Sequence, residues 1–337
     1  MLAAVYKGLK NIVLEDYKLR SLDKNELLIK VTNCGICGTD RHIYEGKAPS
    51  GVPVILGHEY SGIVVEKGSN NSKFKVGDRV TIDPNIFCGY CDYCKRGKVH
   101  FCENHQALGV TLNGGFAEYS IVPTSQAYLV PDDFDLSLAS FAEPLSCCLR
   151  GMDRAAVKHG DSIIVVGGGT IGLIMIQLAK IAGASRILLI EPVASKQKIG
   201  LELGADYVVD PLDNNLFEKT ESILGYADRK VIECVGSTKT AYLSVKLAGK
   251  GGTVIIFGLA PKEHELSVNL QFLFKNETKI LNSYLNPFTF APALDLLINK
   301  RVNVQKLISN QISLKEINTV FSNRDDSTNI KQQIRIN

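Results

Sequence analysis

The chain has 337 residues, with 38 Lys and Arg against 35 Asp and Glu, a formal net charge of +3, and 45% apolar residues. This composition is ordinary for a folded protein and excludes wholesale disorder, and so small a charge does not indicate a nucleic-acid partner. No apolar run reaches the ~18–20 residues of a membrane span, and no basic region followed by an apolar stretch opens the chain. We therefore expect a cytoplasmic protein without a secretory signal, with two or three domains.

The nine cysteines are unevenly distributed along the chain. An odd number in a reducing compartment argues against a disulfide framework. Four of them fall within fifteen residues, at Cys88, Cys91, Cys94 and Cys102. Cysteines this close together predict a metal site.

Up to about Glu143, the chain consists of short apolar runs broken by Gly and turn signals. This pattern predicts a compact, mostly β unit. The predicted strands are Glu26–Val31, Pro53–Leu56, Ile63–Val65, Arg79–Ile82 and Tyr119–Val122.

After about Asp161, strands alternate with helices, which predicts right-handed βαβ units and a doubly wound parallel sheet. The predicted strands are Ser162–Val166, Arg186–Ile190, Tyr207–Val209, Lys230–Cys234, Thr253–Phe257 and Lys279–Leu281. Helices are predicted over Thr170–Ala182 and Ser195–Leu203, each followed by a Gly. The tail from Pro287 has one predicted helix, Ala291–Asn299. Because the tail is too short to be a domain, we expect it to pack onto the N-terminal unit.

The turn after the first of these strands, Gly167–Gly172, fits the GxGxxG pattern. It follows a strand, opens a helix at Thr170 and Ile171, and precedes an acidic residue, Glu191, by nineteen positions. In that context, Gly167 allows the turn, Gly169 lets the backbone approach a pyrophosphate, and Gly172 lets the helix approach the sheet. Glu191 suits ribose hydroxyls and repels a 2′-phosphate, which favours NAD. Lys196 lies near enough to tolerate a phosphate, so use of NADP stays open.

The spacing of the four clustered cysteines, Cys-x2-Cys-x2-Cys-x7-Cys, predicts a tetrahedral zinc site. Four thiolates leave no position for water or substrate, so this site is expected to be structural. Replacement of one thiolate by His100 or His105 is an alternative. A nucleic-acid-binding zinc module is a second alternative, but the flanking Lys95, Arg96 and Lys98 lack interleaved aromatic residues.

Cys37, His58 and Glu143 are scattered singly, and their spacing does not link them. Each lies in a motif, and these motifs occur in one order along the chain: CGICGTD at 34–40, GHE at 57–59, VGDRV at 76–80, the four-cysteine segment, GGFAEY at 114–119, EP at 143–144 and GGGTIG at 167–172. In these motifs the chain resembles the zinc-dependent medium-chain dehydrogenases, the alcohol and polyol dehydrogenase superfamily.

This resemblance covers nearly the whole chain and implies an α/β fold of two domains. A GroES-like, mostly β catalytic domain is expected over residues 1–145, completed by 286–337. A Rossmann domain with a doubly wound parallel sheet is expected over residues 146–285. The active site is implied to lie in the cleft between them.

The resemblance also implies the catalytic residues. Cys37, His58 and Glu143 look like ligands of a catalytic zinc, and a Glu at the third position is the pattern of the sorbitol dehydrogenase branch. Glu59 is similar to a mobile carboxylate that can approach the metal. Asp40 resembles the group that orients the ligand histidine.

A proton relay is implied at Thr39 and His42, because histidine titrates near neutrality. An ordinary surface histidine is the alternative for His42. Cys34 forms a CxxC with Cys37, but we interpret it as structural because Cys37 is needed by the metal. Cys147, Cys148 and Cys234 receive no role.

The predicted function is therefore a zinc-dependent oxidoreductase that moves a hydride between a polyol or secondary alcohol and NAD, with two zinc ions per chain. Plain sorbitol is disfavoured, because Ile43 follows His42 where sorbitol enzymes carry Tyr, and residues 282–286 lack their Arg. The alternatives are a sugar-alcohol phosphate dehydrogenase, with Arg41 or Lys47 as possible phosphate ligands, and a threonine dehydrogenase. A non-catalytic NAD-binding protein is disfavoured by the intact metal motifs. The family implies a homo-oligomer, dimer or tetramer, with neither nucleic-acid nor membrane partners.

Overall fold

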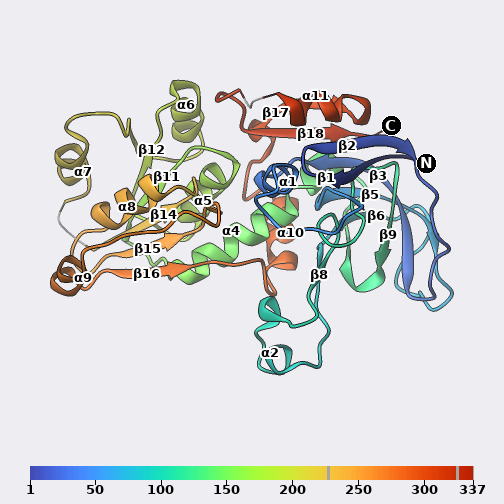
Figure 1. Ribbon diagram of the computed structural model, residues 1–337. Helices are drawn as coiled ribbons and strands as arrows, with labels where there is room; N and C mark the ends of the chain where they lie inside the picture. Colours follow the sequence, from blue (N-terminus) through green and yellow to red (C-terminus); the bar gives the residue numbers. More distant parts are fainter. Residues whose placement is uncertain (226–227, 324–325, 337) are drawn as a thin grey trace.

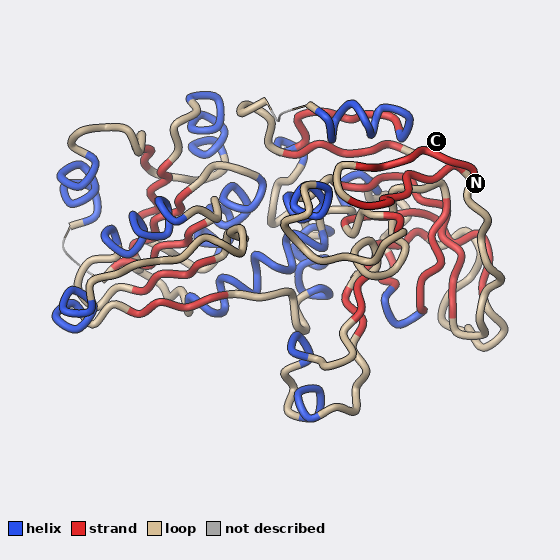
Figure 2. Tube along the Cα trace, viewed as in Figure 1, coloured by secondary structure: helices blue, strands red, loops and turns tan. Residues whose placement is uncertain are grey.

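The computed structural model describes residues 1–225, 228–323 and 326–336. The chain forms two bodies side by side, with helices α4 and α10 between them and a small lobe around α2 that projects away from both (Figure 1). Strands dominate one body, whereas helices and strands alternate in the other (Figure 2). None of the helices in the described ranges has the length and apolar character needed to cross a bilayer.

The β-rich body is organised around β3 (Glu26–Gly35). Along this strand Leu27, Ile29 and Val31 are fully buried and the residues between them are more exposed, the pattern of a strand with one face on a core. Among the described residues, its sheet has seven strands in the order β10-β6-β5-β3-β18-β17, and β9 also pairs with β3. The other strands are β5 (Glu59–Lys67), β6 (Arg79–Ile82), β9 (Tyr119–Pro123), β10 (Ala127–Leu129), β17 (Ile308–Ser313) and β18 (Lys331–Arg335).

Smaller elements complete this body. The small antiparallel pairings join β1 (Leu2–Gly8) to β2 (Asn11–Asp16) and to β4 (Val54–Ile55), and β7 (Asn85–Ile86) to β8 (Gln106–Ala107). The short helices are α1 (Gly38–Tyr44), α2 (Asp92–Lys95), α11 (Ile317–Ser322), η1 (Val99–Phe101), η2 (Thr124–Gln126), η3 (Gln305–Leu307) and η4 (Leu314–Glu316). The tail also belongs here, because β18 pairs antiparallel with β3 and parallel with β17.

In the described part of the second body, six parallel strands form one sheet in the order β13-β12-β11-β14-β15-β16. This is the doubly wound order, which reverses beside the first strand. All five residues of β11 are buried because helices cover both faces of the sheet. The strands are β11 (Ser162–Val166), β12 (Arg186–Ile190), β13 (Tyr207–Val209), β14 (Arg229–Glu233), β15 (Thr253–Ile256) and β16 (Lys279–Asn282). The helices are α5 (Thr170–Ile181), α6 (Ala194–Glu202), α7 (Leu216–Leu224), α8 (Thr238–Leu247) and α9 (Leu270–Asn276).

Helix α4 (Ala142–Ala155) connects the two bodies and packs beside α10 (Phe290–Ile298). The short α3 (Leu136–Ala139) precedes it. Pro144 lies in the first turn of α4, where its missing N–H costs no helical hydrogen bond. One apolar core runs from this region into the parallel sheet, for example from Phe141 to Ile163 and Phe290. The expected boundary between residues 145 and 146 lies inside this continuous helix.

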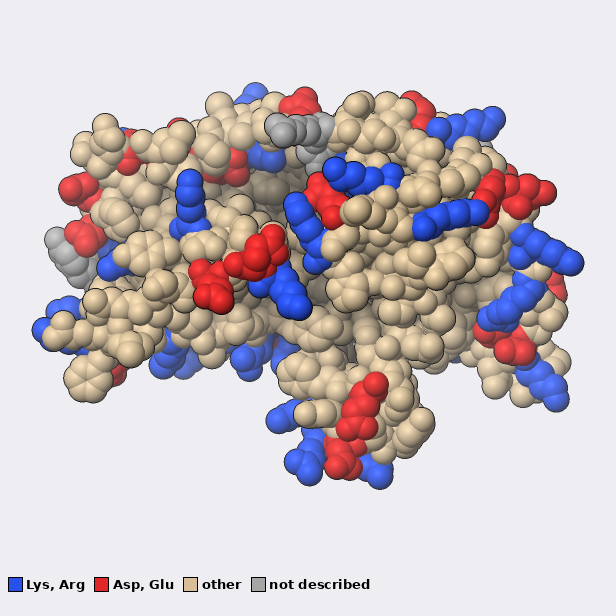
Figure 3. Space-filling view, in the orientation of Figure 1, with Lys and Arg blue, Asp and Glu red and all other residues tan. Residues whose placement is uncertain are grey.

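The predicted fold class, a mostly β unit beside a doubly wound parallel sheet, is confirmed. The predicted strands Arg79–Ile82, Ser162–Val166 and Arg186–Ile190 have the bounds observed. The β1–β2 hairpin, helix α4 and the tail strands β17 and β18 were not predicted. Figure 3 shows Lys and Arg interspersed with Asp and Glu over the face drawn, in keeping with the low net charge.

Candidate active site

A thiol, an imidazole and a carboxylate converge where β3 and β5 lie side by side. Cys37 caps the N-terminus of α1, just after β3, whereas His58 precedes β5 and Glu59 opens it. One ligand atom from each of the three lies within 4.8 Å of the others. His58 and Glu59 are buried, at 6% and 1% exposure. The antiparallel pairing of Gly35 with Glu59 explains how residues distant in sequence meet here.

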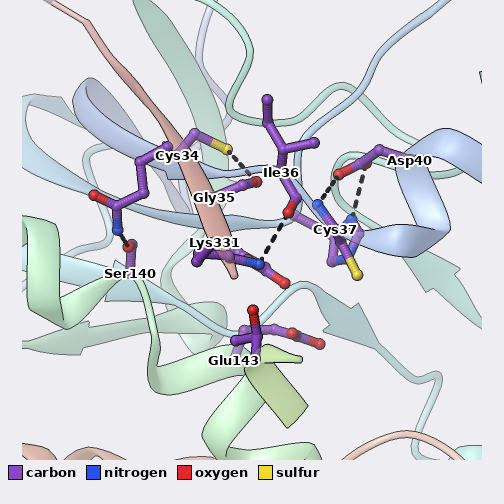
Figure 4. A network of polar contacts seen from close by, with 12 residues as sticks. Cys34, Gly35, Ile36, Cys37, Asp40, Ser140, Glu143 and Lys331 are labelled. Atoms are coloured by element: carbon purple, nitrogen blue, oxygen red, sulfur yellow. Dashed lines mark hydrogen bonds and ion pairs between the residues drawn. The ribbon is translucent and has the colours of Figure 1, made fainter. Parts of the chain in front are cut away.

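Asp40 positions two members of this group. Its Oδ2 accepts a hydrogen bond from the backbone N–H of Cys37 at 2.8 Å, and its Oδ1 lies 3.3 Å from His58 Nδ1 (Figure 4). Burial alone would lower the pKa of His58, but the negative charges of Asp40 and Cys37 raise that pKa well above its ordinary value. Because Nδ1 faces Asp40, the other ring nitrogen remains for a further partner, as in carboxylate-oriented ligand histidines.

Lys331, from β18, also belongs to this site, although the sequence does not predict it. Its Nζ forms an ion pair with Glu59 Oε2 and donates to the Ile36 carbonyl at 3.0 Å. Lys331 is 5% exposed, and the charges of Glu59 and Cys37 raise its pKa even though burial lowers it. Gly35 leaves room for this pair, since a Cβ there would overlap Glu59 Oε2 and lie 2.8 Å from Lys331 Cε. No motif marks Lys331, which stands in an unremarkable polar stretch of the tail.

Glu143 lies in the first turn of α4, buried at 8% exposure. Its Oε1 accepts a hydrogen bond from the thiol of Cys147 at 3.4 Å. Burial and the nearby charge of Glu59 raise the pKa of Glu143 to about 7, although His58 opposes the shift. Within the described residues, the close group contains Glu59 rather than Glu143. Figure 4 shows Glu143 facing the same space as Cys37 and Lys331.

The two expected relay residues, Thr39 and His42, lie on α1 one turn apart, a spacing that places them on one helix face. Both are partly buried. Burial and the charge of Lys47 lower the pKa of His42, which favours the neutral form of its imidazole.

The four clustered cysteines converge in the projecting lobe, where one sulfur from each lies within 4.8 Å of the others. Backbone N–H groups point at two of these sulfurs: Cys88 donates to Cys102 Sγ at 3.3 Å, and Cys91 to Cys88 Sγ at 3.4 Å. Burial raises the pKa of Cys94 to about 12. Burial alone would raise the pKa of Cys88, but backbone N–H groups lower it to about 6.

Neither histidine of the lobe belongs to this group of described residues. His105 pairs instead with Asn85 Oδ1 at 3.0 Å, and the His100 ring packs on Phe101 with centroids 4.1 Å apart. The geometry favours four sulfurs over a set with one imidazole.

The Gly-rich turn leads from β11 into α5. Gly167 has a φ of +102°, and a Cβ on Gly172 would overlap the Gly167 carbonyl oxygen. Gly169 caps α5 and faces open space. Beside the turn, Glu191 is buried, and its carboxylate accepts hydrogen bonds from Gly168 N–H at 2.5 Å and Val193 N–H at 2.9 Å.

The other residues expected around the cofactor lie in two places, the start of α5 and the start of α6. The Thr170 hydroxyl donates to the Ile330 carbonyl at 2.7 Å, which ties the start of α5 to the tail just before Lys331. Ile171 is partly buried against the core. Lys196 lies in the first turn of α6, and its charge acts on Asp326.

Comparison with known proteins identifies both parts of the chain. Residues 23–132 match the alcohol dehydrogenase GroES-like domain, and residues 170–299 match the zinc-binding dehydrogenase family. The D-arabitol-phosphate dehydrogenase of Enterococcus avium is 33% identical over 98% of this chain and 95% of its own length. The sorbitol dehydrogenase of Halalkalibacterium halodurans is 33% identical over 87% of this chain and 86% of its own.

Solved structures agree with this relationship. A zinc-binding dehydrogenase from Sinorhizobium meliloti, solved bound to NADP, has a TM-score of 0.94 and 38% identity, with 99% of this chain and 98% of that chain covered. These matches confirm the family expected from the motifs. The chain therefore belongs to the zinc-dependent medium-chain dehydrogenases, in the branch that contains the sorbitol dehydrogenases.

Proposed function

We propose that this protein oxidises a secondary hydroxyl of a polyol to a ketone with a nicotinamide cofactor, and catalyses the reverse reduction. The observation that carries the proposal is the buried convergence of Cys37, His58 and Glu59 within 4.8 Å, oriented by Asp40. In the overall reaction, the carbinol carbon gives a hydride to the cofactor and the hydroxyl gives a proton to solvent.

The donor set fits a catalytic zinc ion. Zinc accepts thiolate, imidazole and carboxylate ligands at ~2.0–2.3 Å, so three such atoms within 4.8 Å of one another can share one ion. Cys37 and His58 would hold it, with a carboxylate from Glu59 or Glu143 as the third ligand and the fourth position open to substrate. When bound, zinc supplies a Lewis acid that lowers the pKa of a ligated hydroxyl.

The chain's own residues would then move the proton. Thr39 would accept a proton from the substrate hydroxyl while passing on its own, and His42 would take up the relayed proton and release it to solvent. A neutral imidazole is required for this step, and burial together with Lys47 favours the neutral form by lowering the pKa of His42.

The cofactor would lie across the Gly167–Gly172 turn, with its pyrophosphate at the N-terminus of α5 beside Gly169, Thr170 and Ile171. Glu191 would bind the ribose hydroxyls. Because Glu191 is anchored by two backbone N–H groups, its charge stays in place and disfavours a 2′-phosphate. We therefore propose NAD as the preferred cofactor, with Lys196 allowing some use of NADP.

A second zinc ion would be held by Cys88, Cys91, Cys94 and Cys102. Four close thiols with N–H groups aimed at their sulfurs suit a cation that allows all four to ionise. With all four positions occupied, this ion would be structural.

Replacement of Cys37 tests the catalytic assignment. Cys37→Ser should reduce the zinc content from two ions per chain to one and lower turnover of polyols with NAD by at least about 1,000-fold. Cys234→Ser, in the parallel-sheet body, is the matched control and should retain both zinc ions and turnover. Full activity of Cys37→Ser would refute the proposed function.

We further propose that residues 1–145 with 286–337 act as the catalytic unit and 146–285 as the cofactor unit, and that the enzyme works in the cytoplasm. The nine cysteines, all in described segments, form no disulfide, as metal ligation by thiolates requires.

A homo-oligomer is proposed from β16, which is an edge strand among the described strands, and from the neighbouring α9, which exposes Leu270 and Phe274 at 79% and 84%. Light scattering of the purified protein would test this.

A further inference from the structure

We propose that the substrate carries a terminal phosphate monoester and that Arg150 binds this phosphate. The inference rests on the proposed function and names the substrate class of the same site. It is drawn from one face of α4 and from the segment that follows β16.

Four residues of α4 form a row that runs from the candidate active site to the surface. Glu143, Cys147, Arg150 and Arg154 are separated by four, three and four positions, the spacing of one helix face. Glu143 is buried, Cys147 and Arg150 are partly buried, and Arg154 is exposed. Arg150 lies seven residues beyond Glu143, about 10 Å along the axis at 1.5 Å per residue.

The segment after β16 lies against this row. Arg154 Nε donates to the Asn282 carbonyl at 3.1 Å. The next residue, Ser283, has a buried hydroxyl without a hydrogen-bond partner in the described part of the chain. Tyr284 then lines a cavity of about 500 Å³ together with His100 and other residues of the lobe. The segment that contacts Arg154 thus continues directly into a hollow that contains polar groups.

The charge around this hollow is positive. Arg150, Arg154 and Lys98 all lie close enough for their charges to act on His100. The nearby acid, Asp153, interacts with the charge of Arg150 and lines a separate groove together with Leu149 and Met152. Arg150 makes no hydrogen bond or ion pair with any residue in the described ranges. A partly buried guanidinium without a fixed partner is suited to an anion, and its planar fork matches phosphate oxygens.

The distance along α4 between Glu143 and Arg150 indicates how far the anionic group of the substrate lies from its reacting hydroxyl. A sugar alcohol of five or six carbons, held at its reacting hydroxyl beside Cys37 and His58, can extend its far end toward Arg150. The carboxylate of a short hydroxy amino acid is only two carbons from the hydroxyl and falls short. The alternative cations are engaged elsewhere, since Arg41 donates to the Val320 carbonyl and Gln332 Oε1, and Lys47 pairs with Glu45.

The test compares initial rates of the zinc-loaded enzyme with NAD on pentitols and hexitols, on their terminal phosphates, and on aldonates of equal length. We expect kcat/KM for phosphorylated substrates to exceed that for the free polyols by about 100-fold. In Arg150→Met, which keeps the packing of the side chain, this ratio should fall by about 10- to 100-fold through loss of a charged hydrogen bond. Arg150→Lys should recover part of the loss.

The matched control is Arg301→Ala, which removes an exposed guanidinium away from this face and should leave the ratio unchanged. Preference for free polyols or aldonates, or an unchanged ratio in Arg150→Met, would overturn the inference while upholding the proposed function. Absence of turnover with every alcohol tested would overturn both.

Discussion

At the residue scale, the candidate active site gathers several acidic groups around one buried ammonium. Asp40, Glu59 and Glu143 lie near the Cys37 thiol, and Lys331 is the lysine that faces them. A buried charge is tolerated only when it is paired and hydrogen-bonded. Lys331 meets both conditions through Glu59 and the Ile36 carbonyl. By holding Glu59, it also fixes where this carboxylate lies beside Cys37 and His58.

Lys331→Met should therefore destabilise the protein by about 3–5 kcal/mol, because it leaves Glu59 buried without a counter-charge. The double variant Lys331→Met/Glu59→Gln should recover most of that loss, since no charge then remains unpaired. Urea unfolding of the two single variants and the double variant at pH 7 measures the coupling. Additive losses would show that the pair does not interact.

At the element scale, the turn before α5 contains two glycines with different physical requirements. Gly172 lies in the helix against the Gly167 carbonyl, where even a methyl group overlaps. Gly169 has an extended backbone that any residue adopts, and it faces open space. Gly172 is needed for the packing of the helix on the turn, whereas Gly169 leaves room for a ligand at the helix N-terminus.

Gly172→Ala should lower stability by about 1–3 kcal/mol because the turn and helix must move apart. Gly169→Ala should leave stability nearly unchanged and weaken NADH binding by at least about tenfold, since the methyl group occupies the expected pyrophosphate position. Thermal unfolding and NADH fluorescence titration of both variants separate these effects. Equal NADH affinity in Gly169→Ala and wild type would contradict the cofactor placement.

At the scale of the whole molecule, a buried polar network joins the lobe, α4 and the segment after β16. The Asn286 side chain donates to Ser146 Oγ at 2.8 Å and to Asp83 Oδ1 at 3.3 Å, and accepts from Asn85 Nδ2 at 2.7 Å. Burial raises the pKa of Asp83 to about 6 from the ordinary 3.8, despite these hydrogen bonds. The network thus places one titratable group where both bodies and the lobe meet.

The raised pKa predicts how stability depends on pH. Between about pH 4 and 6, the unfolded chain loses the Asp83 proton while the folded protein keeps it. The stabilisation that this proton provides is therefore fully present below pH 4 and is lost as the pH rises through 6. Asp83→Asn should therefore be more stable than wild type at pH 8, by roughly 2–3 kcal/mol, with the difference vanishing toward pH 4.

Urea unfolding from pH 4 to 8 tests this expectation. Asp132→Asn, at an exposed aspartate, is the control and should follow wild type at each pH. A stability difference between Asp83→Asn and wild type that does not change with pH would exclude Asp83 as the titrating group.

Local sequence signals predicted much of this protein correctly. Period-two alternation, glycines after helices and the turn opening α5 depend on neighbouring residues, so strands such as β6, β11 and β12 have the expected bounds. The four cysteines of the lobe lie within one short segment, and their convergence follows from spacing alone. The motifs around Cys37, His58 and Glu143 indicated a catalytic centre, but only through resemblance, because spacing does not link residues so far apart.

The fold class, the Gly-rich turn and the four-sulfur lobe follow from the amino-acid sequence, since each depends on contacts within a few tens of residues. Which side chains share the candidate active site depends instead on how distant strands and helices pack. Strand pairing of β18 with β3 brings Lys331 to Glu59 across more than 270 positions, and α4 brings Arg154 to the end of β16. Such contacts form because the burial of apolar faces brings strands and helices together. A local sequence pattern does not show which polar residues become neighbours as a result.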